Sequence, residues 1–316
     1  MPNQELYHAD CFCWLRDQPA KSIHGVCTDP PFGIVEFLPN EMAKLRSGKG
    51  GVWRLPPTIG GSQRAPLPRF TTLTTKDREH VQTYFREFGK ALIPVLMPGA
   101  HVYLAGTPML QHLVQGGMAE AGFEVRGAIM RLYRGFRGGD RPKLAEAEFP
   151  EVCVTPRGAY EPWMLFRKPI SEKTVAANLR KWGVGALRRL NVDQPFPDII
   201  QSAKTPTVEE SISDHPTIKP QHWLRLLVRS LLPLGIGHIL DPFCGSGSTI
   251  AACRAVGYDA IGIEIDDEYF SALEYNIRRL SILYPQFKGA ALNLPSENQQ
   301  RMPNQAKTQP QMSLFN

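Results

Sequence analysis

The sequence predicts an α/β fold with a mostly parallel central sheet flanked by helices. Two observations predict it. Short strand-like runs alternate with helical patterns along most of the chain, and a glycine-rich loop, "PFCGSG" at 242–247, stands where a buried strand meets a helix. The 316 residues are 42% hydrophobic and 21% charged, which suits a globular protein with a substantial core.

The first half of the chain alternates as this fold requires. Residues 1–33 read as a strand, a short helix and a second strand, "IHGVCTD". Apolar residues recur at three- and four-residue steps in 77–97, which predicts a helix that Pro98-Gly99 ends. A strand "AHVYLAG", a helix near 108–121 and a strand "FEVRGAIMRLY" follow.

The second half repeats the alternation after a break. The segment "YEPWMLFRKP" is strand-like, whereas residues 170–214 read as irregular and basic. A helix is expected over 220–232. Then come the strand "GHILD", the glycine-rich loop, the helix "STIAACRAVG", the strand "DAIGIEID" and a helix over about 267–283.

Charge is unevenly distributed along the chain. The net charge is +6 and the pI about 9.0. Residues 42–76 contain seven Lys or Arg and no Asp or Glu, within a Gly- and Pro-rich insertion at 34–76 that reads as a long loop. Residues 126–190 are also strongly basic. This separation predicts a basic face and a polyanionic partner.

Other classes of protein are disfavoured by what the sequence lacks. The six cysteines show no metal-site spacing, so no metal is expected. No run approaches the roughly 18 apolar residues of a membrane helix, and the start "MPNQELYHADCF" does not resemble a signal peptide. We therefore expect a cytoplasmic protein that does not bind membranes.

The glycine-rich loop has the features of a nucleoside site. Gly245 and Gly247 carry no side chain, and the following helix N-terminus offers free N–H groups. Glu264 ends the next strand, 23 residues after Asp241, where a carboxylate can accept hydrogen bonds from ribose hydroxyls. Ile250 occupies the third glycine position of a dinucleotide loop, which argues against a dinucleotide.

The segment "DPPF" at 29–32 ends the second strand with a distinctive set of groups. An exocyclic base amine is a poor nucleophile because its lone pair is delocalised into the ring. Asp29 and the Pro30 carbonyl can accept its N–H bonds and draw the lone pair toward nitrogen. Phe32 can stack on an extruded base. Taken alone, the segment is equally compatible with a Pro-Pro turn capped by Asp29.

In motif order the chain resembles the circularly permuted β class of amino-group DNA methyltransferases. "DPPF" precedes "DPFCGSG", "HPTIKP" at 215–220 precedes the helix before that loop, and "HADC" at 8–11 matches the family's Gly-Asp element. The resemblance implies a Rossmann-like methyltransferase fold, S-adenosyl-L-methionine as cofactor, and base flipping from double-stranded DNA. Phe32 stands where Tyr is common in the family.

The resemblance also assigns residue roles. The catalytic residues it implies are Asp29, Pro30, Pro31 and Phe32. The cofactor-binding residues it implies are Asp10, Cys11, Asp241, Phe243, Gly245, Ser246, Gly247, Glu264, Thr217 and Lys219. The family's recognition region corresponds to 170–214. Together with the basic insertion at 34–76 and the basic, Gly-rich loop at 134–143, this region gives the candidate DNA-binding residues Lys44, Arg46, Lys49, Arg54, Arg64, Arg134, Arg137, Arg141, Arg180 and Lys181.

We expect a catalytic domain over 1–295 and a tail over 296–316. The tail ends in "QMSLFN", and Gln311–Phe315 resembles the peptide by which bacterial proteins bind the sliding clamp. The expected partners are double-stranded DNA, this clamp and a second copy of the chain. We expect the protein at the nucleoid of a bacterium or phage, as an orphan enzyme or beside a separate restriction enzyme.

Several functions remain open from the sequence. The leading hypothesis is methylation of adenine N6. The N4 amine of cytosine is also a poor nucleophile with a delocalised lone pair, so methylation of cytosine N4 is the alternative. The related cytosine enzymes, however, usually carry Ser at the Asp29 position. A catalytically silent DNA-binding protein, or a methyltransferase for RNA or for a protein amide, is a further alternative.

Overall fold

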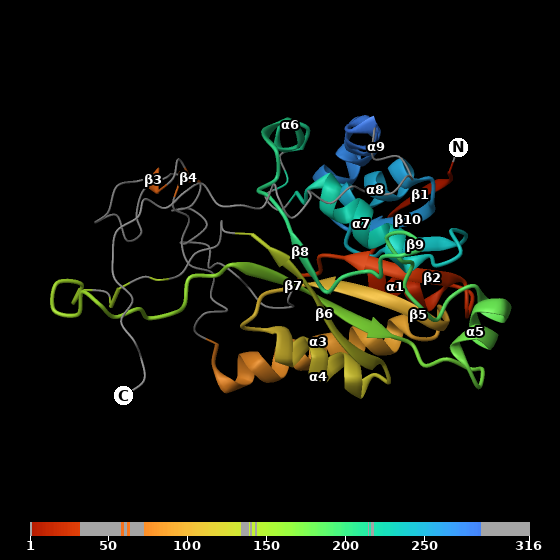
Figure 1. Ribbon diagram of the computed structural model, residues 1–316, viewed down its shortest axis with the longest axis horizontal. Coiled ribbons are helices and arrows are strands. Elements are labelled where there is room, and N and C mark those ends of the chain that lie inside the picture. Colours follow the sequence, from red (N-terminus) through yellow and green to blue (C-terminus); the bar gives the residue numbers. More distant parts are fainter. Residues whose placement is uncertain are drawn as a thin grey trace.

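The computed structural model describes residues 2–31, 58–59, 62–63, 73–133, 139, 141–142, 144–213, 215 and 218–285. Figure 1 shows a central sheet with helices on both faces. The strands in the described part are β1 Gln4–His8, β2 Ile23–Thr28, β3 Thr58–Ile59, β4 Ser62–Gln63, β5 Leu96–Ala105, β6 Glu124–Leu132, β7 Tyr160–Arg167, β8 Ile199–Gln201, β9 His238–Asp241 and β10 Asp259–Glu264. The helices there are α1 Cys11–Arg16, α3 Thr75–Leu92, α4 Gln111–Glu120, α5 Val175–Trp182, α6 Thr207–Glu210, α7 Gln221–Leu231, α8 Ser248–Val256 and α9 Asp267–Ile282.

The sheet confirms the predicted α/β fold. Its eight strands run in the order β1-β10-β9-β2-β5-β7-β6-β8. Neighbours pair in parallel, except that β7 is antiparallel to both β5 and β6. The C-terminal strands β9 and β10 therefore lie between β1 and β2, the first two strands of the chain. This places the glycine-rich loop beside Asp29, which follows β2, although about 210 residues separate them.

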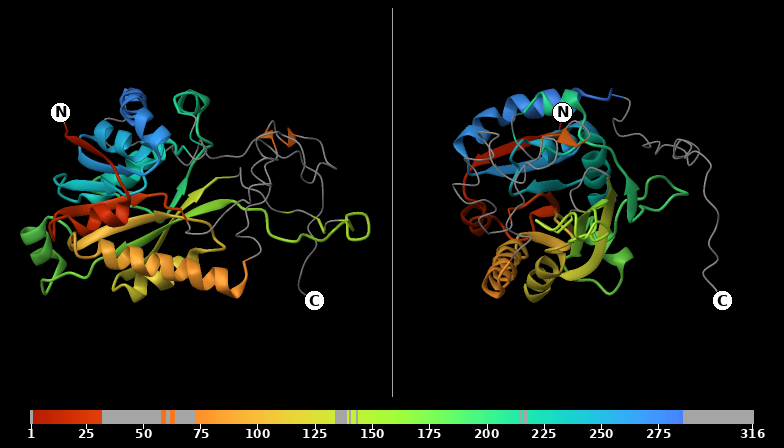
Figure 2. Two further views of the ribbon diagram at one scale, coloured as in Figure 1. Left: turned by 180° about the vertical axis from the view of Figure 1, so that it is seen from behind. Right: turned by 90° about the vertical axis from the view of Figure 1, so that its left-hand side faces the viewer.

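Helices cover the sheet in two layers, as Figure 2 shows. One apolar cluster contains buried residues of α7, α8 and α9, and the other contains those of α1, α3 and α4. The sheet is apolar on both faces because parallel strands are buried on both sides. Trp163 on β7 and Trp223 on α7 are fully buried and meet edge to face, with ring centroids 6.0 Å apart.

The predicted helix over 77–97 is wrong at its C-terminal end. The helix ends at Leu92, and Pro98-Gly99 lies inside β5 rather than terminating a helix. The register shows how the strand tolerates this pair: Ile23 pairs with Leu96, but Gly25 pairs with His101. The extra residues form a bulge, in which Gly99 adopts a φ of +89°.

The segment 170–214 is more ordered than the sequence suggested, because it contains α5, β8 and α6. The buried side chain of Asn178 fixes α5 to the body by donating hydrogen bonds to the Pro98 and Val184 carbonyls, over 2.8 and 2.7 Å. The described part of the 34–76 insertion contains the small antiparallel pair β3–β4. Its last residues start α3, where Thr74 and Asp77 form a capping box.

Candidate active site

Four carboxylates line the carboxyl-terminal edge of the sheet. Asp10 follows β1, Glu264 ends β10, Asp241 ends β9 and Asp29 follows β2. Because these strands are neighbours in this order, the four acids come from adjacent strand ends. Ligands of open α/β sheets bind outside the carboxyl ends of the strands. This edge is therefore the candidate site.

The glycine-rich loop is tied to the neighbouring strand β10. The Cys244 N–H donates to the Ile263 carbonyl over 2.9 Å, and the Gly245 N–H donates to Glu264 Oε2 over 2.7 Å. Gly247 then caps α8 with a φ of +79°. The first N–H groups of α8 therefore open toward the same edge of the sheet.

The two glycines are required for a reason beyond the one predicted. A Cβ on Gly247 would lie 2.8 Å from Ile277 Cγ1, so the missing side chain makes room for α9. A Cβ on Gly245 would lie 2.8 Å from His215 Nε2. Both glycines thus let other parts of the protein close around the loop, besides any approach of a ligand.

Glu264 is held in place by backbone donors. Oε1 accepts from the N–H groups of Ile265 and Asp266, each over 2.9 Å, and Oε2 accepts from Gly245. The residue is only 9% exposed. A carboxylate has about four acceptor positions, and three are already used, so Glu264 keeps one for a ligand hydroxyl while its orientation is fixed.

Asp10 and Cys11 occupy the turn between β1 and α1. Asp10 caps α1 by accepting from the Cys13 N–H over 2.9 Å. Cys11 points into the core instead, and burial raises the pKa of its thiol to about 12. Any contact of Cys11 with a ligand would therefore come from its backbone.

Asp241 and Phe243 lie at the start of the glycine-rich loop, where it leaves β9. Burial raises the pKa of Asp241 to about 6, and the nearby Thr28 and Thr249 side chains, together with a hydrogen bond from the Phe243 N–H over 3.2 Å, offset only part of this effect. The Phe243 ring packs on Phe88 of α3, with centroids 5.4 Å apart. The Ser246 and Ser248 hydroxyls are hydrogen-bonded over 2.6 Å.

Asp29, the acid of the "DPPF" segment, follows β2, which is the neighbour of the strand β9 that leads into this loop. Its side chain is 29% exposed, Pro30 is buried, and Pro31 is exposed. Lys219 Nζ lies 2.5 Å from Asp29 Oδ2, so the structure brings Lys219 to the acid of this segment. Phe32 and Thr217 lie outside the described residues.

Glu161 and Arg131 join the site without having been predicted. Glu161 Oε1 lies 3.4 Å from Lys219 Nζ, and its Oε2 accepts from Arg131 Nη1 over 3.1 Å. Both residues are charged side chains within runs that read as buried strands, "YEPWMLF" and "IMRLY". That mismatch is the sequence signal that could have identified them.

The predicted DNA-binding residues fall into separate places. Seven lie outside the described residues, namely Lys44, Arg46, Lys49, Arg54, Arg64, Arg134 and Arg137. Arg141 is exposed in the β6–β7 connection and donates to the Pro150 carbonyl. Arg180 and Lys181 lie on α5, which packs at the start of β5, the opposite edge from Asp29.

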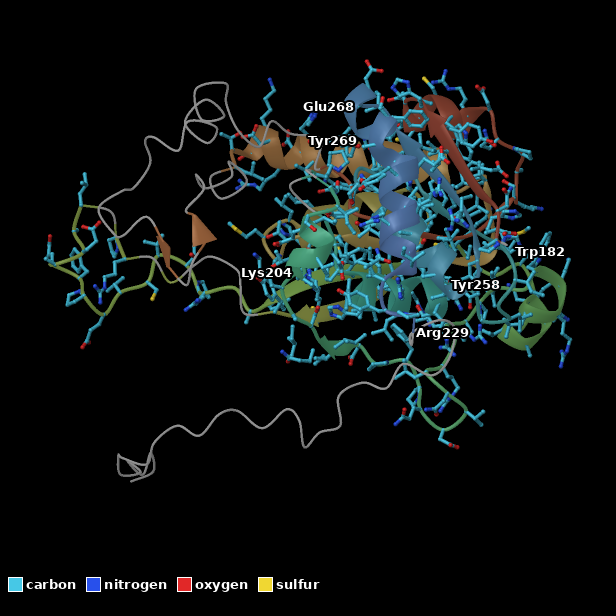
Figure 3. All side chains as sticks on the ribbon, turned by 90° about the horizontal axis from the view of Figure 1, so that it is seen from above. Trp182, Lys204, Arg229, Tyr258, Glu268 and Tyr269 are labelled. Atoms are coloured by element: carbon cyan, nitrogen blue, oxygen red, sulfur yellow. The ribbon has the colours of Figure 1, made fainter. Side chains whose placement is uncertain are left out.

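Figure 3 shows this separation: Trp182, the last residue of α5, lies on the far side of the molecule from Lys204, which follows β8. Lys181 is also paired with Glu172 over 2.6 Å. Arg180 and Lys181 are therefore not part of the surface around the candidate site, and we do not include them in the proposed DNA-binding face.

Two further observations concern metals and membranes. Within the described residues, no group of three or more His, Cys, Asp or Glu side chains could hold a metal ion. None of the helices in the described part is long and apolar enough to cross a membrane.

Comparison with known proteins places this geometry in a family. A model of the N6/N4 methyltransferases, described as DNA methylase, matches residues 23–275. The type II methyltransferase M2.DpnII of Streptococcus pneumoniae is 24% identical over 266 residues, covering 84% of this chain and 85% of its own length.

Two solved structures share the Rossmann-like fold. The M1.HpyAVI complex with S-adenosylmethionine aligns with a TM-score of 0.52 at 16% identity, over 86% of this chain and 98% of its own. The PvuII DNA methyltransferase, described as cytosine-N4-specific, aligns with a TM-score of 0.55 at 16% identity, over 91% and 93%.

Proposed function

The chain belongs to the N6/N4 DNA methylase family, and from that premise we propose that it methylates the exocyclic N6 amine of a flipped adenine in double-stranded DNA. The methyl donor is S-adenosyl-L-methionine. The observation that carries the proposal is the placement of Asp29 one strand from the glycine-rich loop, since Val26 of β2 pairs with Leu240 of β9.

The edge of the sheet suits this cofactor. S-adenosylmethionine supplies an electrophilic methyl group on a positively charged sulfonium and also carries an ammonium group. A row of carboxylates complements both positive charges. In this proposal Glu264 accepts a ribose hydroxyl, and Asp10, which follows the neighbouring strand, lies close enough to accept another. The N–H groups at the start of α8 belong to the same edge.

The "DPPF" segment then acts on the amine. Asp29 and the Pro30 carbonyl accept the two amine N–H groups, so the nitrogen lone pair turns toward the methyl group as positive charge develops. No covalent intermediate is needed, because positioning and hydrogen bonding supply the rate increase. Phe32 is assigned the stacking role on the base.

We favour adenine because an acid stands at Asp29. Cytosine N4 is the second candidate, since the same acceptors fit its amine and the PvuII enzyme, which acts on cytosine N4, shares the fold. We further propose that the basic insertion 34–76 and Arg141 bind DNA, that the protein acts at a bacterial or phage nucleoid, and that Gln311–Phe315 binds the clamp.

The test is to incubate the protein with DNA and deuterium-labelled S-adenosylmethionine, digest the DNA to nucleosides, and analyse them by mass spectrometry. The proposal expects labelled N6-methyladenine. Labelled N4-methylcytosine instead would support the second candidate. Absence of label in DNA, with label in RNA or protein or nowhere, would reject the proposed function.

A further inference from the structure

Lys219 is a buried cation held between two carboxylates. Its side chain is 14% exposed, and Nζ lies 2.5 Å from Asp29 Oδ2 and 3.4 Å from Glu161 Oε1. Burial by itself would lower the pKa of Lys219, but Asp29 and Glu161 outweigh that effect and raise it. The ammonium therefore stays charged, and at least one of its three N–H bonds is directed at the proposed catalytic acid.

Glu161 is anchored on its other side. Its side chain is 12% exposed, and Oε2 accepts from Arg131 Nη1 over 3.1 Å and from Trp163 Nε1 over 3.0 Å. Although burial acts in the opposite direction, Lys219 and Arg131 lower the pKa of Glu161, so it stays ionised.

Arg131 links this chain of charges to the rest of the protein. Its Nε donates to Ser202 Oγ over 3.0 Å, and its Nη2 donates to the Ala203 carbonyl over 2.8 Å. Negative and positive groups alternate from Asp29 through Lys219 and Glu161 to Arg131. This series of charged side chains begins with Asp29, after β2, and is anchored by residues of β6 and β7. It can therefore hold Asp29 rigidly.

We propose that Lys219 and Glu161 act as a positioning pair for Asp29, and that Lys219 is not primarily a cofactor ligand. The proposal rests on the proposed function of Asp29. Because Lys219 occupies Oδ2, the other oxygen, Oδ1, is left to face the amine of the base. Within the described residues, Oδ1 has no hydrogen-bond partner. Glu161 acts one step removed, by holding Lys219 in place.

The alternative is that Lys219 binds the carboxylate of the cofactor. The observed contacts argue against this as its main role, because both partners of Nζ lie on the β2 and β7 side of the site. Glu264 and Asp10 lie on the other side, beyond β9. The two roles predict different kinetic effects.

The test compares Lys219→Met, Lys219→Arg, Glu161→Gln and the double variant Glu161→Gln/Lys219→Met with the wild type. Single-turnover methyl transfer is measured at saturating S-adenosylmethionine, and the cofactor Kd is measured by calorimetry. Lys204→Met serves as control, since Lys204 is exposed and pairs only with Glu210 among the described residues. Thermal unfolding reports whether each variant folds.

A misplaced reacting group costs roughly a hundredfold in rate. We expect a loss of about that size for Lys219→Met and a smaller loss for Glu161→Gln, with the cofactor Kd within about twofold of the wild type. Lys219→Arg should recover part of the rate, because it keeps the charge. The double variant should be no slower than Lys219→Met, because Glu161 acts through Lys219.

Three results would overturn the pair's role. The first is a cofactor Kd raised tenfold or more by Lys219→Met with an unchanged rate at saturation, which would make Lys219 a cofactor ligand. The second is independent, multiplying losses of rate in the double variant. The third is no loss of rate in Lys219→Met. A wild-type protein that labels no DNA would instead reject the proposed function.

Discussion

The Gly245 N–H donates a hydrogen bond to Glu264 Oε2 over 2.7 Å, which joins the glycine-rich loop to the acid at the end of the next strand. The two features that predicted a nucleoside site are thus parts of one hydrogen-bonded unit. Since Glu264 also accepts from Ile265 and Asp266, its orientation is set before any ligand binds.

Glu264→Gln is therefore expected to weaken cofactor binding. The amide keeps a single acceptor oxygen, so a backbone N–H on one side of the residue loses its partner. Hydrogen bonds to charged groups contribute about 1.5–3 kcal/mol, which corresponds to a Kd roughly tenfold to a hundredfold higher. Calorimetry with S-adenosylmethionine measures this. Glu268→Gln, an exposed change on the first turn of α9, is the control. An unchanged Kd for Glu264→Gln would remove Glu264 from the proposed site.

Gly247→Ala should destabilise the fold. The change places a side chain at a φ of +79° and within 2.8 Å of Ile277, so strain and overpacking together cost about 2–4 kcal/mol. Gly257→Ala is the matched control, because Gly257 has a φ of +88° with nothing within 4 Å of the added Cβ. Its cost should be limited to about 1–2 kcal/mol. Urea unfolding compares the two. Equal losses of unfolding free energy in the two variants would show that the contact of the added Cβ with α9 contributes nothing to the cost of Gly247→Ala.

Asp241→Asn should change how stability depends on pH. The folded-state pKa of about 6 lies above the ordinary value of 3.8, so the folded protein binds this proton more tightly than the unfolded chain. The resulting stability is present below about pH 4 and is lost as pH rises through 6. Asn does not titrate, so the stability of the variant relative to the wild type should rise between pH 4.5 and pH 8, by at most about 3 kcal/mol.

Urea unfolding of both proteins at the two pH values gives this difference directly. Titration of the other groups is common to both proteins and largely cancels. A difference that is independent of pH, or that falls toward pH 8, would contradict the described burial of Asp241.

The adjacency of Asp29 and the glycine-rich loop could be predicted from the sequence. Strand-ending motifs identified Asp29 and the loop at Gly245, and a parallel sheet brings the carboxyl ends of neighbouring strands together. The order of the motifs in the chain did not matter, because adjacency in a sheet is independent of adjacency in sequence.

The supporting contacts could not be predicted, because they depend on distant partners. Lys219 meets Asp29 across 190 residues, and nothing near Lys219 in sequence indicates it. The charge of Glu161 within a run that reads as a buried strand marks the residue, but it does not indicate the partners Lys219 and Arg131. Similarly, Pro98-Gly99 reads as a helix stop. The pair instead forms a bulge within β5, because β5 is hydrogen-bonded to β2 on one side and to β7 on the other.

The role of Asp29 is tested most directly by the Asp29→Asn variant, studied by single-turnover methyl transfer and by calorimetry with S-adenosylmethionine. Asn keeps the shape but loses the charge that draws the amine lone pair outward. We expect a rate lower by about a hundredfold or more, with a cofactor Kd within a few fold of the wild type. A variant that transfers methyl groups at the wild-type rate, or that loses the cofactor instead, would contradict the role of Asp29 as the acceptor at the reacting amine.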